Sequence, residues 1–149
     1  MTDEELLARV RDAFAELEPV PVQVLAAGRA AFAFREPGAV LAGLTGDHGA
    51  AAAGLRGSGL GGTARLLTFA GPDIEVEIEV TGSGADREIS GRLAPPGPAR
   101  IRVRHPDGEL ACQTDLAGHF AMAAVPAGLV SLVFRLPDAT SIVTRWVRL

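Results

Sequence analysis

The sequence predicts a mainly β protein, in which an antiparallel β-sandwich of about seven or eight strands follows a short α-helical N-terminal segment. Two observations predict this arrangement. Apolar residues recur at every third or fourth position at the start of the chain, which is the period of a helix with one apolar face. From residue 65 onward they recur at every second position, and turns containing Gly and Pro separate the runs, as in a half-buried sheet.

The first 44 residues are expected to be helical. Thr2 and Glu5 have the spacing of a capping box, in which each side chain binds a backbone N–H that the first helical turn leaves unpaired. Prolines then end this helix, and Pro21 suits the first turn of a second one. The run AVLAGL at residues 39–44 is expected to add a further turn. The apolar stripe of the first helix comprises Leu6, Val10, Ala13, Phe14 and Leu17.

The second helical stretch is apolar on nearly all sides, so it needs a surface to cover. A segment of about 44 residues is near the size at which chains need outside support to fold. Two arrangements satisfy this need: the helices pack on the C-terminal domain of their own chain, or they dock on another protein as helices in a groove. The docking hypothesis assigns the partner-binding role to Phe14, Leu25, Phe32, Phe34 and Leu41.

Residues 45–64 are expected to form a Gly/Ala-rich linker with the composition of a flexible spacer, in which His48 is solvated. The linker contains a formal GxGxxG at Gly57, Gly59 and Gly62. In a dinucleotide-binding fold such glycines follow a strand and open a helix, so that the helix N-terminus meets the pyrophosphate. Here a strand is expected after the glycines and a spacer before them. The motif is therefore interpreted as a coincidence of composition.

Residues 65–149 are expected to form the β-sandwich, because short alternating runs are separated by turn residues at regular intervals. A glutamate row and an arginine row on two of the strands are interpreted as solvated strand faces, and whether they face each other across strands is left open. These rows are Glu75, Glu77 and Glu79, and Arg100, Arg102 and Arg104. The expected strands cover residues 65–70, 73–80, 87–94, 99–105, 109–115, 119–124, 129–136 and 141–149.

Within this β region, about 50 residues resemble the carboxypeptidase regulatory-like domain, a transthyretin-type β-sandwich. The residues themselves predict that Gly118 forms a turn and that Phe120 fills the core. The resemblance implies an appendage or binding module instead of a catalytic unit. The sequence departs from the pattern at Val130 and Ser131, where the family usually has an aromatic residue. The matching positions are Gly91 and Leu93, Ile101 and Val103, Asp107 and Gly108, Thr114, Asp115, Gly118 and Phe120, Pro126 to Gly128, and Leu132 and Phe134.

The whole layout also resembles small proteins of high-GC bacteria that are encoded beside extracytoplasmic-function sigma factors and caspase-like proteases. The resemblance rests on the segment Ala27–Arg35, the Gly/Ala linker, and Trp146 and Val147 near the end. It implies regulation by protein contact. The chain would bind and inhibit a sigma factor, or would be the target or adaptor of a caspase-like protease.

Composition argues against several function classes. The formal net charge of −4 and the pI near 5.3 disfavour nucleic-acid binding, which depends on phosphate contacts. The acidic N-terminus has neither the basic nor the apolar region of a signal peptide, and no apolar stretch approaches the ~20 residues of a membrane span. The sequence therefore predicts a soluble, cytoplasmic protein.

No catalytic, cofactor-binding or metal-ligating residue is predicted. Cys112 lies evenly between His105 and His119, but paired ligands of the C-x₂-C or H-x₃-H kind are missing, and the cysteine is expected to pack beside Leu110. A hydrolase that uses Cys112 with one of these histidines would need support from its fold. The remaining alternative is a ligand-binding module whose sandwich loops hold a sugar or a peptide.

Overall fold

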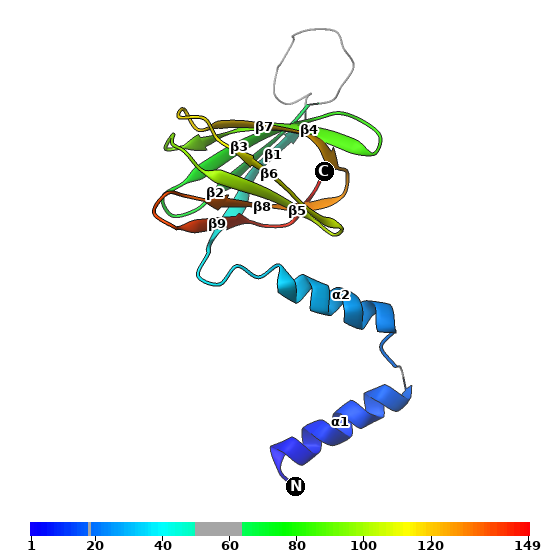
Figure 1. Ribbon diagram of the computed structural model, residues 1–149. Coiled ribbons are helices and arrows are strands. Elements are labelled where there is room, and N and C mark those ends of the chain that lie inside the picture. Colours follow the sequence, from blue (N-terminus) through cyan, green and yellow to red (C-terminus); the bar gives the residue numbers. More distant parts are fainter. Residues whose placement is uncertain (18, 50–63) are drawn as a thin grey trace. The chain divides into compact units, whose positions relative to one another are not determined.

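The computed structural model describes residues 1–17, 19–49 and 64–149, which form two compact units (Figure 1). Residues Met1–Pro37 are called the helical unit and residues Gly38–Leu149 the sheet unit. The helical unit contains α1 (Asp3–Leu17) and α2 (Val22–Ala33). The strands of the sheet unit are β1 (Val40–Gly49), β2 (Arg65–Ala70), β3 (Glu75–Thr81), β4 (Asp86–Ala94), β5 (Arg100–His105), β6 (Gly108–Gln113), β7 (His119–Pro126), β8 (Leu129–Arg135), β9 (Ser141–Thr144) and β10 (Val147–Arg148).

The expected capping box is confirmed at the start of α1. The Thr2 amide donates to Glu5 Oε2 at 2.9 Å, and the Glu5 amide donates to Thr2 Oγ1 at 3.3 Å. Acidic residues in the first turn also complement the positive end of the helix dipole. Pro21 is the N-cap residue of α2, with the extended ψ of 140° that a residue before a helix adopts.

The strands form one sheet in the order β6-β5-β8-β9-β1-β2-β3-β4-β7, with β10 added to β8. All neighbours pair antiparallel except β1 and β9, which are parallel over Val40–Ala42 and Ile142–Thr144. The first and last strands of this order, β6 and β7, contact each other, so the sheet curls into a shape close to a barrel (Figure 1). The mainly β prediction is confirmed, whereas the described sheet is mixed and has ten strands instead of a seven- to eight-stranded antiparallel sandwich.

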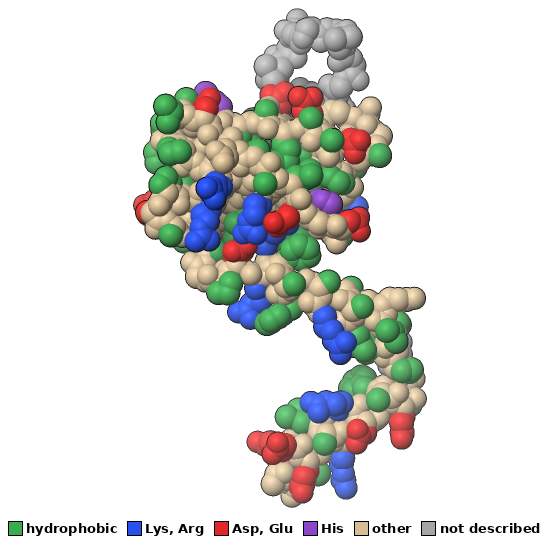
Figure 2. Space-filling model, viewed as in Figure 1, with side chains coloured by type: hydrophobic (Ala, Val, Ile, Leu, Met, Phe, Trp, Pro, Cys, Tyr) green, Lys and Arg blue, Asp and Glu red, His purple; other side chains and the backbone are tan. Residues whose placement is uncertain are grey.

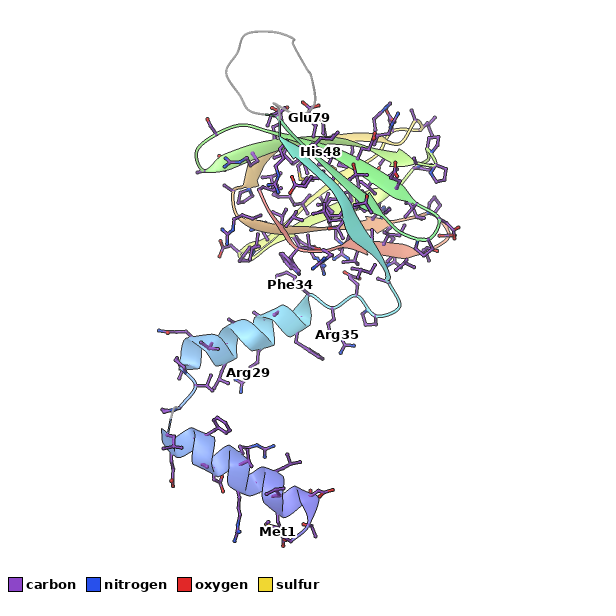
Figure 3. All side chains as sticks on the ribbon, turned by 180° about the vertical axis from the view of Figure 1, so that it is seen from behind. Met1, Arg29, Phe34, Arg35, His48 and Glu79 are labelled. Carbon is purple, nitrogen blue, oxygen red and sulfur yellow. The ribbon has the colours of Figure 1, made fainter. Side chains whose placement is uncertain are left out.

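Strand β1 accounts for this difference. Residues 40–44 were expected to end the helical segment and residues 45–49 to begin the linker, but all of them lie on β1. His48 is on this strand (Figure 3), where its register partner on β2 is Leu66. The Gly-rich sequence of β1 lacks the alternation of apolar and polar residues that identifies strands, and only Ala42 is buried on it. Its position in the sheet is instead defined by pairing with β2 and β9. Residues 50–63 of the expected linker lie outside the described residues.

An ion pair connects β1 to its antiparallel neighbour. Arg65 Nε and Nη2 donate to the two carboxylate oxygens of Asp47, each at 2.7 Å, and Arg65 Nη1 donates to the Arg148 carbonyl oxygen at 2.6 Å. The hydrogen bond from Arg65 lowers the pKa of the Asp47 carboxyl below its usual value. One guanidinium therefore links β1, β2 and β10 at their ends.

The core lies inside the curled sheet and is built from aliphatic and phenylalanine side chains. The rings of Phe120 and Phe134 pack edge to face, with centroids 5.8 Å apart. Gly91 lies opposite Phe120 on the next strand, and a Cβ at this glycine would overlap the Phe120 ring. Gly118, at φ +81°, forms the turn before β7, and Asp115 Oδ1 accepts hydrogen bonds from two amides of that turn. Phe120 thus fills the core and Gly118 forms a turn, as expected.

Candidate functional site

The helical unit exposes its apolar side chains. No residue of α1 or α2 is buried. Figure 2 shows apolar side chains along both helices, with charged side chains between them. On α1 the stripe from Leu6 through Val10 to Phe14 follows the helical period, and Phe14 is 68% exposed. Exposed apolar faces of this kind are candidates for interaction sites.

Four of the five predicted contact residues belong to the helical unit. Phe14 lies on α1, and Leu25 and Phe32 lie seven residues apart on one face of α2, where they are 48% and 67% exposed. Phe34 is the C-cap residue of α2 and is half-buried (Figure 3). Leu41 lies on β1 in the sheet unit and is 62% exposed. The predicted contacts are therefore divided between the two units.

A basic side chain accompanies the aromatic residue of α2. The Arg35 guanidinium carbon lies 5.0 Å from the centroid of the Phe32 ring, within the range of a cation–π contact. Figure 3 shows Arg29 on α2 and Arg35 just after its last turn. The apolar surface of α2 is thus combined with positive charge.

The arginine row on β5 was expected to be solvated along its whole length, and at Arg104 this prediction is wrong. Arg104 is 3% exposed, while Arg100 is exposed and Arg102 half-buried. Arg104 Nη2 donates to Ser131 Oγ at 2.9 Å, and Ser131 Oγ donates to the Thr144 carbonyl oxygen at 3.0 Å. The row therefore ends in a buried polar cluster of Arg104, Ser131 and Thr144.

A bulge lies between β9 and β10, beside Thr144 of this cluster. Both strands pair with β8, where Val143 lies opposite Val133 and Val147 opposite Val130. Three steps along β8 thus correspond to four along the opposite chain, and one extra residue is accommodated. The Trp146 ring lies over the Arg104 guanidinium, 5.6 Å from its carbon. Sequence alternation alone contains no sign of this bulge.

The glutamate row and the arginine row do not face each other. Glu77 on β3 accepts a hydrogen bond from Arg92 Nη2 on β4 at 2.7 Å. Arg102 on β5 pairs with Glu109 on β6 at 3.3 Å. Glu77 and Arg102 are thus each paired with a residue on a neighbouring strand, and these exposed pairs contribute little to stability.

The cysteine and histidines do not assemble a reactive site in the described part of the chain. Cys112 faces the core beside Leu110, and burial raises the pKa of its thiol, whereas a nucleophilic cysteine has a lowered pKa. His119 Nδ1 lies 3.7 Å from Asp115 Oδ2, with both side chains well exposed. Among the described residues, no group of three His, Cys, Asp or Glu side chains could hold a metal ion. None of the described helices is long and apolar enough to cross a membrane.

Comparison with known proteins identifies no relative. No protein-family model matches the chain, and no curated protein and no solved structure matches it. The resemblance to the carboxypeptidase regulatory-like domain stays a prediction, and the candidate site rests on the apolar faces of the helical unit.

Proposed function

We propose that this chain is a non-enzymatic regulatory module that binds another protein through its helical unit. The observation that carries the proposal is that α1 has an apolar stripe and α2 is apolar on nearly all sides, yet neither helix has a buried residue. A helix of 15 or 12 residues gains most of its stability in proteins from packing of such a face. A partner groove would supply that packing.

The exposed phenylalanines are the expected anchors. Large aromatic side chains that enter a pocket on the partner dominate the energy of such interfaces. Phe14 and Phe32 are each about two-thirds exposed, so they are available to a partner. The core of the sheet unit is complete without them.

The proposed partner is an extracytoplasmic-function sigma factor that the chain inhibits, or a caspase-like protease for which it is a target or adaptor. This partner class rests on the resemblance of the layout to proteins encoded beside such genes. The sheet unit would act as a stable scaffold, since Cys112 and the histidines form no reactive cluster in the described residues.

The first test replaces the anchors in the full chain. We expect Phe14→Ala and Phe32→Ala each to weaken partner binding by about 2 kcal/mol, roughly 30-fold, as interface anchors do. The melting temperature should not change, because both rings are exposed. Binding is measured by titration with a purified sigma factor and a purified caspase-like protease encoded near this chain.

Matched controls come from the opposite helix faces. Asp12 and Gln23 are exposed and lie about half a turn away from Phe14 and Phe32, respectively. Asp12→Ala and Gln23→Ala should leave binding within about twofold of the unmodified chain. If the phenylalanine variants bind normally but melt at a lower temperature, the rings belong to the protein's own core, and docking through the helices is wrong.

A further inference from the structure

Two adjoining hollows lie where three loops of the sheet unit meet. The β2–β3 turn, the β4–β5 loop and the β8–β9 turn all contribute to their lining. The hollows have volumes of about 470 and 390 Å³ and share Pro98, Leu136 and Pro137. They therefore adjoin, and we call the two hollows together the loop groove. Each volume lies within the range of ligand-binding pockets, about 300–1,000 Å³.

The larger hollow is apolar and rigid. Proline rings lose little conformational freedom when a ligand covers them, because φ is already fixed. No aromatic side chain lines either hollow among the described residues, so the stacking surface that a sugar would use is missing there. The apolar lining comprises Val40, Ile74, Leu93, Leu136 and Ile142, with Pro72, Pro95, Pro96, Pro98 and Pro137.

The smaller hollow carries positive charge. Arg100 on β5 and Arg135 on β8 are direct register partners, are both exposed, and both line this hollow. Like charges directly opposite each other destabilise a sheet. Neither arginine forms an ion pair with a described residue. An anionic group of a ligand would relieve this repulsion.

The larger hollow carries negative charge at its margin. Asp73 and Asp138 both line it, and both are exposed. The Thr140 amide donates to Asp138 Oδ1 at 2.9 Å, and this hydrogen bond lowers the pKa of the Asp138 carboxyl. The loop groove thus has acidic side chains along one part, arginines along the other, and an apolar lining.

We propose that the loop groove binds an extended peptide segment of a partner protein, in which an acidic residue, a short aliphatic run and a basic residue follow one another. A fatty acid offers a single charge and would place its chain beside Asp73 and Asp138. A peptide matches both charges and the apolar lining. This site goes beyond the proposed function, because it lies on the sheet unit and uses none of the helical anchors.

The test uses short synthetic peptides and the full chain. Six acetylated and amidated peptides place two, three or four leucines between a pair of glutamates and a pair of lysines, in both sequence orders. Binding is followed by NMR titration of the ¹⁵N-labelled chain. We expect the best peptide to bind saturably, with a Kd below about 1 mM. The changes in amide chemical shift should be largest in the three loops of the groove.

Two sets of variants locate the site. A Cβ at Gly97, in the groove, or at Gly49, at the far end of β1, meets no atom within 4 Å, so neither position is blocked at the Cβ. Gly97→Leu should weaken binding at least about tenfold, and Gly49→Leu should not change it. Charge reversal by Arg100→Glu and Arg135→Glu together should weaken peptide binding by a similar factor. Arg145→Glu, outside the groove, should not weaken it.

Charge reversal provides the decisive comparison. The chain with Arg100→Glu and Arg135→Glu should bind the version of the peptide in which lysines replace the glutamates, which the unmodified chain should not bind. Circular dichroism confirms that each variant is folded. The proposal is overturned if no peptide binds saturably, if Gly97→Leu binds like Gly49→Leu, or if the reversed arginines leave peptide preference unchanged. These results do not depend on α1 or α2, so they are distinguishable from failure of helical docking.

Discussion

At the scale of single residues, the buried cluster around Arg104 shows how a cation is kept inside a small β protein. A buried guanidinium is costly unless its donors find acceptors. Ser131 Oγ accepts a hydrogen bond from Arg104 Nη2 and donates one to the Thr144 carbonyl oxygen, while Thr144 Oγ1 accepts from the Leu132 amide at 2.9 Å. The hydroxyls thus connect β5, β8 and β9.

This arrangement predicts a selective effect of removing one hydroxyl. Ser131→Ala leaves Arg104 Nη2 without this acceptor, and hydrogen bonds to charged groups contribute about 1.5–3 kcal/mol. We expect the free energy of unfolding to fall by about this amount in urea denaturation. Ser90→Ala, at an exposed position on β4, should change it by less than about 0.5 kcal/mol. Equal effects of the two substitutions would show that the cluster contributes nothing.

At the scale of single elements, β1 joins the two halves of the sheet. It pairs with β9 through residues 40–42 and with β2 through residues 43–49. Without it, β9 and β2 would both become open edges, and the strand order would be interrupted between them. The range expected for the β region, residues 65–149, therefore leaves out β1, which is a central strand of the sheet.

Two fragments test the role of β1. Residues 38–149 should unfold cooperatively, because they retain every strand of the sheet unit. Residues 64–149 should lose cooperative unfolding in thermal melts followed by circular dichroism, since two strands lose a neighbour. Adding a peptide of residues 38–49 should restore part of the structure. A fragment 64–149 that melts like 38–149 would show that β1 is dispensable.

The individual elements also show what sequence patterns can and cannot predict. Strands β2 to β8 lie within a few residues of the expected ranges, because short apolar runs are separated by turn residues. Strand β8 is a buried run without alternation, and the strand expected at residues 141–149 is divided into β9 and β10. Strand β1 and the parallel β1–β9 pair could not be predicted, because only one residue of β1 is buried and its partners are distant in sequence. The capping box at Thr2 and the core position of Phe120 depend on local spacing, and both were predictable.

At the scale of the whole molecule, the candidate sites differ in how far the sequence could predict them. The apolar surfaces of α1 and α2 follow from local sequence, so the helical positions of Phe14, Leu25 and Phe32 could be predicted, whereas Leu41 lies on a strand. Their role as partner anchors stays a prediction. The loop groove was not predicted, because residues 72–74, 95–98 and 136–140 meet only through strand register. Its two arginines, Arg100 and Arg135, lie opposite each other only because β5 pairs with β8.

The central claim, that the helical unit is the docking element, is tested most directly by one titration. The partner that binds the full chain is titrated against the full chain and against residues 38–149. The account predicts that removing residues 1–37 weakens binding at least about a hundredfold, since the aromatic anchors are lost while the sheet unit remains folded. Equal affinity of the full chain and of residues 38–149 would contradict it.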